Sequence, residues 1–319
     1  MTTATTNPRP LLSRVATMLG SGISNQVGAA AGAHAFGAIG PAGVVAMRQI
    51  VAAAVLLPIA RPSIRRMTWA QWWPTLLLAA VFATMNLSLY VAIDRIGLGL
   101  AVTLEFLGPL GVALASSRSR VHLLAAASAA VGVYVLVLPG PSSDYVGIGL
   151  ALIAAASWAA YILLNRTVGA RLPGLEAPAI ATSVSALLYL PVVIGLTAQG
   201  RLNGLPLFYA ITAGVLSSVV PYAADLIVLR HVPARFFGTF MSMYPVWAAL
   251  AGLLLLDQVP ALHVWIGIAV IALSNVVAVV TARDGTSHRR RDGVDGPSAV
   301  RHRLRIGDRP TRSCGPRSS

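Results

Sequence analysis

Long apolar stretches separated by short polar segments occupy the chain from residue 13 to residue 281. A helix needs about 20 apolar residues to cross the hydrocarbon of a bilayer. The pattern predicts ten such stretches, at 13–36, 40–60, 73–93, 98–115, 121–138, 146–165, 177–197, 207–229, 236–256 and 263–281. Most are apolar on every side, which is typical of helices within a membrane. We therefore expect an all-α polytopic membrane protein.

The composition agrees with this prediction. Hydrophobic residues make up 56% of the 319 positions and charged residues only 11%. Soluble domains carry about 25% charged residues, so this chain lacks the polar surface that would dissolve it.

The positive charge is unevenly distributed between the loops. Every basic residue is arginine, and one alternating set of loops holds eleven arginines before the tail, whereas the other set holds only Arg95 and Arg201. Arginine is enriched in loops that stay in the cytoplasm. The pattern therefore predicts that both termini are cytoplasmic and that the helix count is even. We expect the protein to lie in the plasma (inner) membrane.

The two ends of the chain differ from its apolar body. Residues 1–12 form a short N-terminal segment, and residues 282–319 hold ten arginines, four aspartates and the single cysteine, Cys314. Such a composition is typical of a disordered segment. An arginine-rich tail could bind nucleic acid or anionic lipid, but we expect a solubilising cytoplasmic tail that reinforces topology, with no nucleic-acid partner.

Two parts of the chain resemble each other at low resolution. Pro109 in the fourth predicted helix and Pro245 in the ninth are separated by 136 residues, as are Asp94 and Arg230 just before those helices. The repeating unit is thus five helices, at 13–138 and again at 146–281, and an odd number of helices inverts the second copy. Inverted repeats with interrupted helices are typical of secondary transporters. The two prolines are either hinges or only packing features.

Four ionisable residues within predicted spans are candidates for a function, and a charge near the bilayer centre costs about 2.5–3.5 kcal/mol. His34 closes the first predicted helix and is either an interfacial residue, as we expect, or a proton relay. Glu105 is the candidate proton-coupling carboxylate, and the alternative is a structural ion pair. Arg48 could bind a substrate carboxylate with its planar fork or pair with Glu105. Asp225 follows Ser218 and Tyr222 at helical spacing, so it either couples protons or bonds to a loop at the membrane edge.

Further polar and aromatic residues could line a cavity between the helices. The candidates on the first, third and sixth predicted helices are Gln26, Asn86, Tyr90 and Trp158. Tyr161 and Asn165 continue the helical spacing of Trp158 toward one end of the helix. Aromatic residues there either contact a ligand or anchor the helix at the membrane interface.

No catalytic motif accompanies these residues. The sequence has no phosphate-binding loop of the ATPase type, no zinc-protease motif and no paired cysteines. We expect neither an enzyme nor a bound metal or cofactor.

Several segments resemble the EamA-type drug/metabolite transporter superfamily and, within it, the bacterial threonine and homoserine exporters. They are Gly40–Gly43 before Arg48, Asn86–Arg118 with the motif LEFLGPL, Ser157–Leu163, Pro221–Asp225 and Pro233–Pro245. The resemblance implies ten helices in two inverted repeats and proton-driven efflux of small amino acids. It places the family's acidic position on Glu105 and its helix-two arginine on Arg48.

The chain departs from those exporters at two positions. Tyr244 stands where the motif of the ninth helix commonly has glutamate, and a lysine expected near the end of the first helix is absent, with His34 close by. At Asp225 the family usually has glutamate. We place Tyr244 and Tyr222 with Arg48, Gln26, Asn86, Tyr90 and Trp158 in the predicted substrate site.

These observations predict a proton-antiport exporter of small amino acids or related metabolites. The expected partners are an amino-acid-like substrate, protons and the lipid bilayer. The alternatives are an exporter of drugs or larger metabolites, and a passive membrane channel.

Overall fold

Helices make up nearly all of the part of the chain that the structure describes. The computed structural model describes residues 9–115, 120–138, 143–169, 171–172, 176–221, 224 and 241–281, and these ranges contain no strand. The helices of the first half are α1 (Arg9–Ala33), α2 (Phe36–Ala60), the 3₁₀ turn η1 (Ile64–Arg66), α3 (Trp69–Ile96), α4 (Leu98–Glu105), α5 (Leu107–Ala115) and α6 (Arg120–Val137). The helices of the second half are α7 (Tyr145–Gly169), α8 (Glu176–Leu188), α9 (Leu190–Ala198), α10 (Gly204–Gly214), the π-helix η2 (Val215–Val219), α13 (Tyr244–Leu255) and α14 (Leu262–Thr281).

Four of these helices are long and apolar enough to cross a membrane, namely α2, α3, α7 and α14. The bent pair α8 and α9, which meet at 45°, brings the number to five if it forms one span. Every range predicted from the apolar pattern contains helix. Within the described chain, the helices other than these four and the bent pair do not meet the length and hydropathy criterion for a membrane span. The protein is therefore a multi-pass membrane protein.

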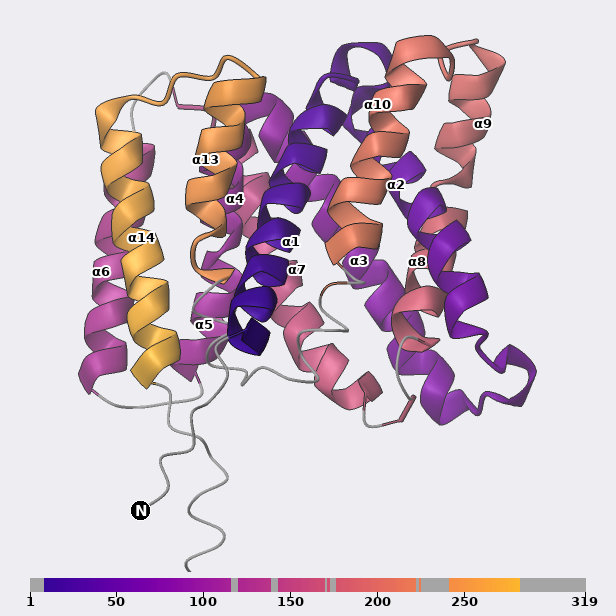
Figure 1. Ribbon diagram of the computed structural model, residues 1–319, viewed down its shortest axis with the longest axis horizontal. Helices are drawn as coiled ribbons and strands as arrows, with labels where there is room; N and C mark the ends of the chain where they lie inside the picture. Colours follow the sequence, from indigo (N-terminus) through magenta and orange to yellow (C-terminus); the bar gives the residue numbers. More distant parts are fainter. Residues whose placement is uncertain are drawn as a thin grey trace, which may run out of the picture. The chain divides into compact units, whose positions relative to one another are not determined.

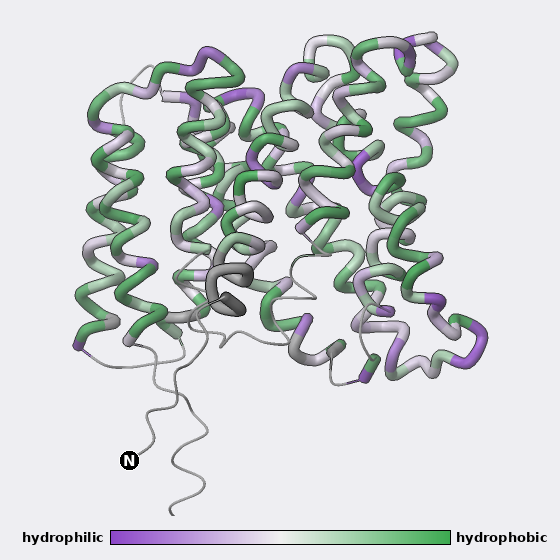
Figure 2. Tube along the Cα trace, in the orientation of Figure 1, coloured by the Kyte–Doolittle hydropathy of each residue, from purple (hydrophilic) through white to green (hydrophobic). Residues whose placement is uncertain are grey.

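Small residues allow the helices to pack closely. A Cβ atom on Gly99 of α4 would lie 2.9 Å from Ala249 Cα of α13, and one on Gly28 of α1 would lie 2.8 Å from the backbone nitrogen of Ser217. Membrane helices associate through such small residues, because lipid tails remove the hydrophobic driving force between them. Many large apolar side chains are exposed on the outer faces of the helices. Hydrophilic positions are concentrated at helix ends and in loops (Figure 2).

The main helix contacts join the first half of the chain to the second. Figure 1 shows α6 beside α14, and α1 between α13 and α10. The cross-half pairs include α1 with α10, α2 with α8, α3 with α7, α4 with α13, and α6 with α14, and also α2 with α10, α3 with α8, α4 with α7, α5 with α7 and α1 with α13. The polar residues described below lie where α1, α2, α3 and α4 meet η2 and α13.

Helix breaks lie close to prolines. α4 ends at Glu105 and α5 begins at Leu107, one turn before Pro109. Proline clashes with the carbonyl four residues earlier, here that of Glu105, which explains a break at this point. Pro245 opens α13 after a turn at Ser242 and Met243, and Pro191 likewise opens α9. The bend at Pro191 was not among the predicted features.

Candidate functional site

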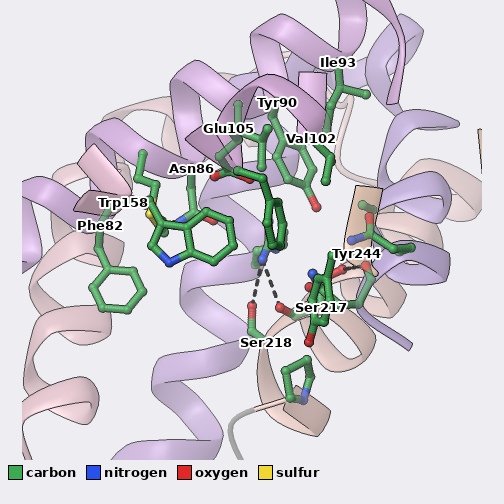
Figure 3. A pocket seen from close by; sticks show the side chains of 18 of the residues that line it. Phe82, Asn86, Tyr90, Ile93, Val102, Glu105, Trp158, Ser217, Ser218 and Tyr244 are labelled. Atoms are coloured by element: carbon green, nitrogen blue, oxygen red, sulfur yellow. Dashed lines mark hydrogen bonds between the residues drawn. The ribbon is translucent and has the colours of Figure 1, made fainter. Parts of the chain in front are cut away.

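A cavity of about 150 Å³ lies between the two halves of the chain. Its polar lining comes from α1, α2, α3, α4 and η2 and comprises Asn25, Gln26, Arg48, Gln49, Asn86, Tyr90, Glu105, Ser217 and Ser218. Its apolar and aromatic lining comprises Ala29, Phe82, Met85, Leu89, Ile93, Val102, Phe106, Trp158, Pro221, Met241 and Tyr244. Figure 3 shows side chains from both groups turned toward a common space.

Arg48 crosses from α2 to the π-helix of the second half. Its Nη2 atom donates hydrogen bonds to the carbonyl oxygen of Ser217 at 3.1 Å and to the hydroxyl of Ser218 at 3.3 Å, the dashed lines of Figure 3. The guanidinium carbon lies 4.7 Å from the centre of the Tyr90 ring, a cation–π distance. The side chain is only 9% exposed, and its Nε atom has no partner among the described residues. Arg48 thus lines the cavity and keeps one buried N–H donor without a partner among the described residues.

Glu105 is the last residue of α4, where the helix breaks, and is 6% exposed. Arg48 is close enough to act on this carboxylate electrostatically. Within the part of the chain that the structure describes, no ion pair of 4.0 Å or less involves either residue. The cavity therefore has one positive and one negative group in its wall, and neither neutralises the other by direct contact.

The π-helix η2 positions the partners of Arg48. The Ser217 hydroxyl donates to the carbonyl of Asn25 at 2.8 Å, and the Ser24 hydroxyl donates to the carbonyl of Leu216 at 2.9 Å. These two bonds join η2 to α1, which approaches closely at Gly28. π-Helical turns are frequent at functional sites. The consecutive serines 217 and 218 within an apolar run were the only sequence signal of this element.

Aromatic rings form one wall of the cavity. The Phe106 ring lies 4.7 Å from that of Trp158 at an interplanar angle of 83°, and 5.7 Å from that of Tyr244 at 39°. Tyr244 also packs on α1, because a Cβ atom on Gly22 would lie 3.2 Å from its ring. The ring thus occupies space that a shorter acidic side chain would leave open.

A hydrogen bond joins the start of α4 to the loop after α13. The side-chain oxygen of Gln258, in the loop after α13, accepts a hydrogen bond of 2.9 Å from the backbone N–H of Leu98 at the start of α4. No side chain from α4 itself caps this terminus. The preceding Gly97 has a φ of 85°, and a Cβ atom there would lie 3.1 Å from the same oxygen. We call this contact the Gln258 latch.

An ion pair lies near the same end of the molecule. Arg95 Nε is 3.0 Å from Asp144 Oδ2, and Asp144 also accepts a hydrogen bond of 2.8 Å from the N–H of Gly147 in the first turn of α7. These two contacts hold the pKa of the Asp144 carboxyl below its ordinary value, the Gly147 amide contributing most. The last turn of α3 and the start of α7 are thereby tied together.

The structure brings most of the predicted site residues to one place. Those that line the cavity are Gln26, Arg48, Asn86, Tyr90, Glu105, Trp158 and Tyr244. Pro109 and Pro245 lie beside helix breaks and do not line it. Tyr222 and Asp225 fall outside the described residues. Tyr161 and Asn165 hydrogen-bond to each other away from the cavity, at 3.4 Å, and His34 stacks on Tyr209.

The site has the features of a membrane transport protein. A small polar cavity with opposite charges lies between helices of a multi-pass membrane protein, at helix breaks of the kind that line transport sites.

Comparison with known proteins identifies the family. The EamA-like transporter family matches residues 145–280. The threonine/homoserine exporter RhtA of Salmonella typhimurium (strain LT2) is 34% identical over 260 residues, covering 80% of this chain and 85% of that protein. RhtA of Escherichia coli (strain K12) is 32% identical over 238 residues, covering 74% and 80%. The chain belongs to the EamA-like transporter family.

The chain is also similar, more distantly, to two further proteins. The uncharacterized transporter YwfM of Bacillus subtilis (strain 168) is 24% identical over 225 residues, covering 67% of this chain and 75% of that protein. A protein of known crystal structure superposes with a TM-score of 0.60 at 19% identity, over 84% of this chain and 98% of that chain. The structural match supports the fold alone.

Proposed function

We propose that this protein exports small amino acids of the threonine or homoserine kind from the cytoplasm by proton antiport. The observation that carries the proposal is the pair of buried opposite charges, Arg48 and Glu105, which line one cavity without contacting each other. An amino acid is a zwitterion, so a guanidinium and a carboxylate that make no ion pair within the described chain complement its two ends. The RhtA relatives, whose printed name is threonine/homoserine exporter, support the same class of substrate.

The size of the cavity favours a small cargo. The cavity volume is about 150 Å³. Sites for drug-sized ligands are about 300–1,000 Å³. The wall formed by Phe106, Trp158 and Tyr244 is the one feature that favours a larger apolar cargo, and the volume argues against it.

The helix contacts support ten helices in two inverted repeats. Numbered within each five-helix unit, α2 with α8, α4 with α13 and α6 with α14 are pairs of equivalent helices. In the same numbering, α1 corresponds to α7 and α3 corresponds to α10. Exchanging the two units therefore turns the contact of α1 with α10 into the contact of α7 with α3. A two-fold relation between the units, 13–138 and 146–281, produces this reciprocal pattern, in the same way that a symmetric dimer contacts itself.

The Gln258 latch suggests how access could alternate. In the proposed topology, it closes the outer end of the cavity by joining the start of α4 to the loop after α13. Export then requires the two units to separate at this latch while they close on the cytoplasmic side. In this mechanism Arg48 holds the substrate carboxylate, and Glu105 exchanges the substrate ammonium for a proton. A closed outer end argues against a passive open channel.

The test is gradient-driven threonine transport by Glu105→Gln in proteoliposomes. We expect this variant to insert normally and to lose the acceleration that a pH gradient gives the wild type. Glu176→Gln is the matched control, because Glu176 opens α8 and does not line the cavity. Full gradient-driven transport by Glu105→Gln would eliminate the coupling role of this carboxylate.

A further inference from the structure

An unneutralised basic surface lies at the loop between α2 and α3. Arg61, Arg65 and Arg66 are exposed in this loop, and Arg171 is exposed beside it. None of the four is in an ion pair of 4.0 Å or less with a described carboxylate, and residues 61–73 contain no acidic residue. Glu176, at the start of α8, likewise makes no such pair with them. Four positive charges therefore lack a partner in this part of the molecule.

The backbone of this surface is ordered by specific contacts. Arg61 ends α2 with a left-handed φ of 44°, and its Nε donates to the carbonyl of Pro58 at 3.3 Å. Arg65 and Arg66 follow in the 3₁₀ turn η1, and a capping box of Thr68 with Gln71 then begins α3. The arginines are consequently presented on a defined turn.

Contacts across about a hundred residues fix Arg171 to the same place. Its Nη1 donates to the carbonyl of Ala70 at 2.6 Å, and its own carbonyl accepts a bond of 3.1 Å from Gln71 Nε2. Its guanidinium lies 5.5 Å from the centre of the Trp73 ring. Arg171 thus belongs to the same basic surface as the arginines of the loop.

Large apolar side chains are exposed beside these charges. Trp69 is 73% exposed and Ile59 is 62% exposed. Tryptophan at the end of a membrane helix lies at the level of the lipid headgroups. A soluble anion would use the arginines alone, whereas a phospholipid would use the arginines for its phosphate and the apolar groups for its chains.

We propose that Arg61, Arg65, Arg66 and Arg171, together with Trp69 and Ile59, bind the headgroup of an anionic phospholipid. We call this set the α2–α3 lipid site. The phosphate lies against the unpaired guanidinium groups near the start of α3, whose helix dipole adds favourable potential. The part of the acyl chain nearest the headgroup lies along Trp69 and Ile59. This site does not depend on which substrate the protein carries.

The test uses the purified full-length protein in detergent, titrated with phosphatidylglycerol while thermal unfolding is followed. We expect phosphatidylglycerol to raise Tm more than phosphatidylcholine does. Arg65→Gln and Arg66→Gln should each weaken the apparent affinity about fivefold, because each basic residue near a surface of anionic lipid contributes about that factor. Trp69→Ser should weaken it as well, since the chain contact is lost.

Two controls make the outcome decisive. Arg201→Gln removes an exposed arginine from the loop between α9 and α10, and it should leave the affinity for phosphatidylglycerol unchanged. The Tm values of the variants in phosphatidylcholine should match the wild type, because these side chains are exposed. Equal protection by inorganic phosphate, or equal weakening by Arg201→Gln, would overturn the α2–α3 lipid site.

Discussion

Replacing Gln258 by methionine should open the cavity to the outer side more often. Methionine is similar in length to glutamine but offers no strong acceptor, so the part-buried N–H of Leu98 loses its hydrogen bond of 2.9 Å. A buried donor left without a partner costs about 1–3 kcal/mol. The cost falls on the latched state alone, because the latch is broken when the outer end opens. The open population should therefore rise about 5- to 150-fold.

Cysteine labelling measures this population directly. The chain has one cysteine, so Cys314→Ser followed by Val102→Cys places a single thiol on α4 in the cavity wall. An impermeant maleimide added to intact cells should react faster, by the same factor, when Gln258→Met is added. Gln258→Glu is the matched control, because it keeps an acceptor oxygen, and it should label no faster than the parent. An unchanged rate with Gln258→Met, or an equal rise with both variants, would refute the latch.

Three further predictions concern other parts of the molecule. Arg48→Lys should raise the KM for substrate in counterflow about tenfold or more, because hydrogen bonds to a charged group are worth about 1.5–3 kcal/mol and lysine lacks the planar fork; an unchanged KM would exclude carboxylate binding by Arg48. Gly28→Ala should lower thermal stability by about 1–3 kcal/mol, because its Cβ would lie 2.8 Å from the Ser217 nitrogen, whereas Gly20→Ala on the same helix meets nothing within 4 Å and should not. The pKa of Asp144 is lowered by the Gly147 amide and by Arg95, so its stabilising effect should be complete above about pH 4 and lost as the pH falls through the lowered value. When Tm is measured against pH, Asp144→Asn should accordingly reduce the fall in Tm at acid pH. Parallel curves for the variant and the wild type would contradict the stabilising role of the Asp144 carboxylate.

The positions of the helices could be predicted because apolar length is a strong signal. Each apolar run had to become helix, since backbone polar groups in lipid find partners only within regular structure. The breaks were harder to place. Pro109 marked the interruption after Glu105, and Pro191 offered the same kind of signal for the bend before α9, which was missed. The π-helix at Val215–Val219 has no such marker in the sequence and packs against α1 and α2. Four or five helices satisfy the spanning criterion within the described chain, so the ten-helix architecture stays a prediction supported by the contact pattern.

The charged residues of the site were found because a charge in an apolar run is costly and needs a reason. Arg48 and Glu105 were identified in this way, and the structure places both at one cavity. Ser217 and Gln258 were missed for physical reasons. A serine in a helix usually bonds to its own backbone, so nothing in the sequence signals that Ser217 bonds to Asn25 on another helix. Gln258 lies in a loop, and its role depends on the distant start of α4.

Tyr244 shows where resemblance and geometry combine. The resemblance marked this position as one where related exporters commonly carry a glutamate. In the structure, the Tyr244 ring contacts Phe106 and packs over Gly22, so it contributes shape rather than charge to the cavity wall. The described lining then holds one acid and one base, a balance that suits a zwitterion.

The central claim is that this cavity carries a small amino acid across the membrane. Counterflow tests it most directly, with purified protein in liposomes loaded with unlabelled threonine and labelled threonine added outside. The account predicts a transient, saturable accumulation of label that is suppressed by unlabelled homoserine. Accumulation no greater than in protein-free liposomes, for threonine and for homoserine alike, would contradict it.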